Sequence, residues 1–190
     1  MKRIIAICGA MCALASQGFA AERTENVYER MAARESEPHF KERMAESAQR
    51  LEEFAWMLGE WRTTITVFAT KSTPASTTEE NTTFRKFGDT LIADERLSTI
   101  MGYDPFVGRW LLAGFELPAV PLTHAYSDWN GRRMTVELPV RIGGEVFRIR
   151  QTFSRLGADE FELFNEQLLA DGKFHPVDRY RYRRAAAPAH

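Results

Sequence analysis

Arginine and tyrosine alternate near the C-terminus of this 190-residue chain, in the run Asp178-Arg-Tyr-Arg-Tyr-Arg-Arg184. In a strand, this spacing places Arg179, Arg181 and Arg183 on one face, and Tyr180 and Tyr182 on the other. If Arg150 and Arg181 pointed into an enclosed lumen, they could bind a carboxylate through paired hydrogen bonds. The alternative is a ladder of ion pairs with Glu160, Glu162 and Glu166 on the outer face. The outer-face arrangement is favoured because better interior residues are available, namely Phe147, Ile149, Phe161 and Leu163.

Histidine is the next residue type that could do chemistry, and it occurs at positions 39, 124, 175 and 190. No two of these have the spacing of a metal-ligand pair, so a structural metal site is not expected. His124 lies in an expected strand and could act as an acid or base from the lumen, as in a small hydrolase or isomerase. The alternative is a half-buried histidine without a catalytic role.

Two tryptophans, Trp61 and Trp110, lie in expected strands and could contact a ligand. Large aromatic residues at strand starts more often fill the core, and we favour barrel-end packing for Trp61. The candidate ligand contacts are therefore Trp61, Trp110, His124, Arg150 and Tyr180. The chain shows no nucleophile elbow, phosphate-binding loop or dinucleotide motif, so no catalytic residue is assigned.

These residues need a scaffold, and the apolar periodicity predicts a mainly β one. An amphipathic stripe from Phe40 to Leu58 predicts a helix that ends at Gly59. After it the period changes to two, and about nine strands follow at the spacing typical of a barrel or sandwich. The Thr70–Glu80 stretch is expected to be a long loop, Thr90–Thr99 one strand and Val177–Arg184 the last strand. Consecutive hairpins predict a meander, which removes its edges by closing into an antiparallel up-and-down barrel.

The N-terminal 20 residues read as a secretory signal peptide. A basic start is followed by an apolar run that is too short to span a bilayer, with cleavage expected after Ala20. The protein is expected to be periplasmic or secreted, with no membrane span after cleavage. Both cysteines, Cys8 and Cys12, lie in this signal peptide and would be removed by its cleavage. The expected organisation is a helical arm at 21–50, the barrel at 51–184 and a flexible tail at 185–190.

Four short motifs occur in order along the chain: Ala55-Trp-Met-Leu-Gly-Glu-Trp61, Met101-Gly-Tyr-Asp-Pro105 (expected as a turn), Phe161-Glu-Leu-Phe164 and Tyr182-Arg-Arg184. Together they resemble the bacterial domain of unknown function 1579 family of calycin-like barrels. The resemblance implies a barrel of nine to ten strands and implies no activity. The opening motif is also similar to that of nitrobindin, in which a histidine near the last strand binds haem iron. The nearby histidine here, His175, precedes Pro176 in an expected turn, so no cofactor is predicted.

The formal net charge of −1 argues against a nucleic-acid surface, which needs a basic excess. We therefore expect a non-enzymatic protein that binds a small, largely apolar ligand in the barrel lumen. Two alternatives stay open. One is the hydrolase or isomerase built on His124. The other is a structural or partner-binding protein that docks another chain through the Phe40–Leu58 helix face and the Glu22–Glu37 arm. The sequence does not indicate an oligomeric state.

Overall fold

The computed structural model describes residues 27–114, 123–142 and 144–185. The chain divides into two compact units, residues 1–40 and 41–190. In the first unit, helix α1 spans Val27–Glu35. Helix α2 (Phe40–Leu51) begins at the boundary and continues into a 3₁₀ helix, η1 (Glu52–Met57). The expected signal peptide lies outside the described residues and stays a prediction.

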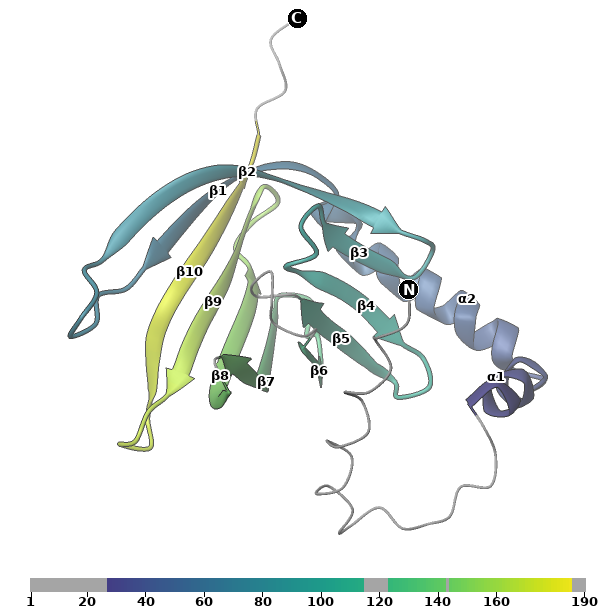
Figure 1. Ribbon diagram of the computed structural model, residues 1–190. Coiled ribbons are helices and arrows are strands. Elements are labelled where there is room, and N and C mark those ends of the chain that lie inside the picture. The colour runs from purple at the N-terminus through teal and green to yellow at the C-terminus, as the bar shows by residue number, and fades with distance from the viewer. Residues whose placement is uncertain (1–26, 115–122, 143, 186–190) are drawn as a thin grey trace, which may run out of the picture. The chain divides into compact units, whose positions relative to one another are not determined.

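The second unit is mainly β, and ten strands follow η1 in the chain. Their bounds are β1 Gly59–Val67, β2 Ser76–Phe87, β3 Leu91–Asp94, β4 Ile100–Asp104, β5 Arg109–Gly114, β6 Thr123–Ser127, β7 Arg133–Ile142, β8 Glu145–Arg155, β9 Glu160–Leu168 and β10 Phe174–Arg184. All the observed pairs are antiparallel, and consecutive strands are neighbours except β6 and β7. The predicted fold class, an antiparallel up-and-down barrel of nine to ten strands behind a helix, is confirmed (Figure 1).

The barrel closes by pairing its first and last strands, but its wall is not continuous. Strand β1 pairs with β10 along its length, from Trp61 opposite Arg184 to Val67 opposite Asp178. Strands β6 and β7 form the two ends of the sheet order, with no ladder between them among the described residues. The Ser127 hydroxyl donates to the backbone oxygen of Thr135 across this seam at 2.7 Å. The barrel is therefore nearly closed, where the sequence predicted full closure.

Four strand assignments differ from the prediction. Strand β2 begins at Ser76, so the loop before it is shorter than Thr70–Glu80. The segment Thr90–Thr99 is not one strand, because β3 ends at Asp94 and a turn follows. In this turn the Asp94 carboxylate accepts hydrogen bonds from the Thr99 amide at 2.9 Å and from the Ser98 hydroxyl at 2.6 Å. Residues Ile100–Asp104, mostly expected as a turn, form β4. Strand β10 starts before the expected Val177 and includes His175.

The helical segment of the second unit covers one end of the barrel. In α2, Ser47 and Leu51 are buried, and the Ser47 hydroxyl donates to the backbone oxygen of Tyr103 in β4 at 2.7 Å. Phe54 of η1 is fully buried and meets Trp110 of β5 edge-on at 4.5 Å between ring centroids. The apolar stripe therefore packs on its own barrel, running alongside β3 and β4 (Figure 1).

Candidate functional site

Aromatic side chains fill the barrel end at which β1 begins. Trp61 is fully buried, and its indole N–H donates to the backbone oxygen of Met57 at 2.7 Å. Its ring meets Phe161 edge-on at 4.7 Å, and Phe161 stacks on Tyr182 at 4.2 Å. This arrangement is the barrel-end packing that we favoured for Trp61, since both its ring and its N–H are occupied within the protein.

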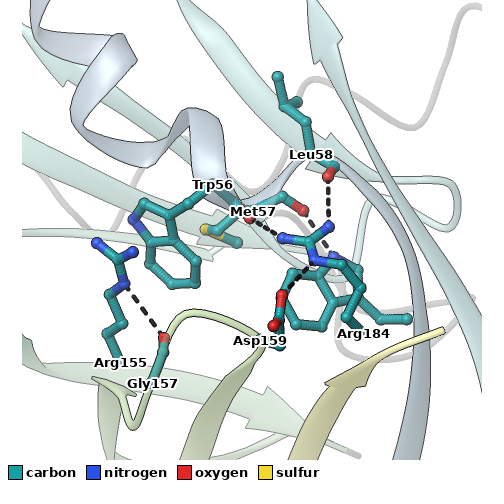
Figure 2. Close-up of polar contacts among 8 residues, drawn as sticks. Trp56, Met57, Leu58, Arg155, Gly157, Asp159 and Arg184 are labelled. Carbon is teal, nitrogen blue, oxygen red and sulfur yellow. Dashed lines mark hydrogen bonds and ion pairs between the residues drawn. The ribbon is translucent and has the colours of Figure 1, made fainter. Parts of the chain in front are cut away.

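An arginine from the last strand holds this end together. Arg184 donates from Nη1 to the backbone oxygen of Leu58 at 3.0 Å and from Nη2 to that of Trp56 (Figure 2). Its Nε donates to the carboxylate of Asp159 at 3.0 Å, and the guanidinium lies 4.1 Å from the centre of the Trp61 ring. One planar side chain thus joins η1, the β8–β9 turn and β10, a task that suits the fixed fork of arginine.

The other end of the lumen holds a cavity of about 350 Å³. Cross-strand register places it away from Trp61, because its walls come from the start of β8, the end of β9 and the start of β10. The apolar part of the wall consists of Val140, Phe147, Ile149, Leu163 and Val177. The polar part consists of Ser98, Thr99, Gln151, Asn165, Gln167, Asp178, Tyr180 and Tyr182. Apolar walls with a few polar groups are typical of small-molecule pockets, and this volume lies within their usual range of about 300–1,000 Å³.

Asn165 and Asp178 form a hydrogen-bonded pair in the cavity wall. They lie directly opposite each other in the β9–β10 register, and Asn165 Nδ2 donates to Asp178 Oδ1 at 2.7 Å. Burial raises the pKa of the Asp178 carboxyl, and the bond from Asn165 only partly opposes that shift. Burial likewise raises the pKa of the Tyr182 phenol. The cavity therefore contains one carboxyl group that is poorly solvated when ionised.

The five predicted contact residues do not form one site. Tyr180 lines the cavity, while Trp61 lies in the aromatic end. Trp110 is also buried and packs between Phe54 and Tyr103. His124 is exposed on β6 and does not line the cavity. Arg150 donates to Glu166 at 2.9 Å and lies 4.0 Å from the centre of the Phe174 ring, also away from the cavity.

The arginines of β10 form ion pairs with β9, as the favoured outer-face arrangement predicts. Arg179 Nε lies 3.3 Å from Glu162, while Arg181 and Arg183 both donate to Glu160 Oε1, at 2.7 and 2.9 Å. These two arginines lower the pKa of the Glu160 carboxyl. None of the five groups lines the cavity. Arg179, Arg181 and Arg183 therefore stay outside the described cavity wall.

The remaining histidine of interest also has a local partner. His175 lies 2.8 Å from the Asp171 carboxylate through Nε2, and it does not line the cavity. Within residues 27–114, 123–142 and 144–185, no group of three or more His, Cys, Asp or Glu side chains could hold a metal ion. In the same part of the chain, no helix is long and apolar enough to cross a membrane.

Comparison with known proteins assigns the chain to no family. No protein-family model matches the chain, and a search of curated protein sequences finds no match. Among solved structures, the chain is similar to a redesigned beta barrel, over 70% of this chain and 94% of that one. The identity is 10% and the TM-score 0.32. The architecture therefore rests on the strand pairing itself, and the likeness carries nothing about ligand or reaction.

Sequence reasoning missed two polar residues of the cavity wall, Asn165 and Asp178. Asp178 lies an even number of residues from Tyr180 and Tyr182 on the same strand. Asn165 likewise lies an even number of residues from Phe161 and Leu163. Alternation alone therefore places both on inward faces. That signal was present in the sequence, but polar residues on a strand are more often solvent-facing, and this expectation obscured it.

Proposed function

We propose that the protein binds a small, largely apolar molecule in the barrel lumen without transforming it. The observation that carries the proposal is the cavity of about 350 Å³ between the aromatic end and the starts of β8 and β10. A lumen filled along its whole length by aromatic side chains would have argued against binding. Here Trp61 and Phe161 fill one end, and the other end stays open.

The two alternatives lack a comparable observation. A hydrolase or isomerase built on His124 would need this imidazole in the lumen, and it is exposed on β6. Docking through the helix face would need an unpartnered stripe, yet Ser47, Leu51 and Phe54 are buried. Export and kinship with the family of domain of unknown function 1579 are separate proposals, supported by the N-terminal leader pattern and by the motifs between Ala55 and Arg184.

Native mass spectrometry of the protein purified from its own compartment tests lumen binding directly. A retained small molecule is expected on the wild-type protein. The Ile149→Trp variant adds an indole to the cavity wall and is expected to lose that mass. The control is Arg148→Trp, which adds the same ring to an exposed position on the same strand. Equal retention in both variants would place the bound molecule outside the lumen and refute the proposal.

A further inference from the structure

The cavity wall has a marked chemical asymmetry. The thirteen described residues of the wall include one carboxylic acid, Asp178, and no lysine, arginine or histidine. The arginines next to Asp178 in sequence are turned away, with Arg179 beside Glu162 and Arg181 bonded to Glu160. The other titratable groups of the wall are the phenols of Tyr180 and Tyr182. Within the described wall, nothing supplies a positive charge to balance Asp178 when it ionises.

The Asn165–Asp178 pair also has spare hydrogen-bond acceptors. Asp178 uses Oδ1 to accept from Asn165, and the described residues give Oδ2 no donor. Asn165 Oδ1 is buried and has no hydrogen-bond partner among those same residues. Buried polar atoms are nearly always paired, so the unpaired Asn165 Oδ1 indicates that a donor comes from elsewhere, and Asp178 Oδ2 beside it offers that donor a second acceptor. A buried carboxylate in particular needs a cation or several donors to offset its lost hydration.

We propose that the lumen selects molecules with an apolar body and a basic amine head, and that the head pairs with Asp178. This inference rests on the proposed lumen binding and specifies its ligand class. An ammonium group offers three donors and no acceptor, which matches a site that presents two acceptors. An alcohol offers one donor and no charge, and an ionised carboxylate offers no donor and a negative charge that Asp178 would repel. The apolar side chains, including Ile149 and Leu163, would enclose the body of the ligand.

The cavity volume sets the size of a suitable probe. If each non-hydrogen group occupies roughly 30 Å³, a chain of eight carbons with one head atom needs about 270 Å³. That fits within the cavity of about 350 Å³. Octylamine, 1-octanol and octanoate share this chain and differ in the head, so a comparison of their affinities isolates the contribution of the head group.

Isothermal titration calorimetry of the purified full chain with these three probes at pH 7.5 tests the proposal. Octylamine is expected to bind about tenfold or more tightly than 1-octanol, because hydrogen bonds to charged groups are the stronger ones. Octanoate is expected to bind weakest. Asp178→Asn keeps the shape and removes the charge, so it is expected to abolish the preference for octylamine while 1-octanol binding stays within about twofold.

Two further variants make the result specific. Glu162→Gln makes the same acid-to-amide change outside the lumen wall and is expected to leave all three affinities unchanged. Gln167→Lys puts an ammonium group on the wall two residues from Asn165 and is expected to weaken octylamine binding selectively. This variant also provides a test if Asp178→Asn fails to fold.

The outcomes separate this inference from lumen binding itself. If 1-octanol binds as tightly as octylamine, or if Asp178→Asn and Glu162→Gln behave alike, selection by Asp178 is wrong and lumen binding stands. If none of the probes binds and the native spectrum shows no retained mass, both proposals fail.

Discussion

Replacing Arg184 by methionine tests whether one side chain secures the aromatic end of the barrel. The change removes two charge-assisted hydrogen bonds to the backbone oxygens of Trp56 and Leu58, and the stacking on Trp61. Hydrogen bonds to charged groups contribute about 1.5–3 kcal/mol each. An exposed cation–π contact adds about 0.5–1 kcal/mol. The Arg184 side chain is 32% exposed, so the lower values apply. We expect the free energy of unfolding to fall by about 3–4 kcal/mol.

Urea unfolding followed by tryptophan fluorescence measures this loss. The control is Arg183→Met, the same substitution one residue earlier. Arg183 is 63% exposed and pairs with Glu160 alone among the described residues, so its loss should cost less than about 1 kcal/mol. Arg184→Lys keeps the charge without the planar fork and should lie between the two. Equal losses for Arg184→Met and Arg183→Met would refute the assigned role.

Three further outcomes follow from the same structure. Phe54→Ala should cost about 3–5 kcal/mol of unfolding free energy in urea, against less than about 0.5 kcal/mol for exposed Phe87→Ala. Because burial raises the pKa of Asp178, wild-type stability should fall as pH rises from its unfolded to its folded pKa. The unfolding free energy of Asp178→Asn, measured over the same pH interval, should not show this fall. If wild type and variant depended on pH in the same way, burial of the Asp178 carboxyl would not be the cause. Arg181 and Arg183 lower the pKa of Glu160 in the folded state. Glu160 should therefore contribute to the free energy of unfolding at pH values above its pKa in the unfolded state, and this contribution should disappear as the pH falls through its pKa in the folded state. In a plot of melting temperature against pH, Glu160→Gln should therefore remove the part of the decrease at acid pH that is due to Glu160.

Strand positions could largely be predicted from sequence because most turns carry recognisable residues. Gly131 lies between β6 and β7 and Gly172 between β9 and β10, and both have positive φ angles, of 85° and 75°, which glycine adopts readily. The β3–β4 turn has no glycine or proline. It is made by Leu97, a non-glycine residue at a φ of 57°, and by the hydrogen bonds of the Asp94 carboxylate. Such a turn depends on one side chain reaching back to the backbone, and local composition does not reveal it.

The candidate site was harder to predict because it depends on pairing between strands. Alternation correctly put Tyr180 in the lumen and the β10 arginines on the outer face. It could not show that Asp178 faces Asn165, because β10 shifts register between Pro176 and Asp178. His124 and Trp110 were predicted as ligand contacts because of their residue types alone. Their actual surroundings depend on tertiary packing, which a single sequence does not specify.

The pairing of β1 with β10 has a consequence for how the molecule forms. The two strands are separated by more than one hundred residues, so the pairing of β1 with β10 closes a long segment of chain into a loop. Contacts of this kind slow folding, because chain entropy is lost before the contact can stabilise the structure. During synthesis, β1 cannot pair with β10 until residues Phe174–Arg184 have left the ribosome. Asp178 lies on that same last strand, so the carboxyl group of the cavity wall is acquired in the step that pairs the first strand with the last.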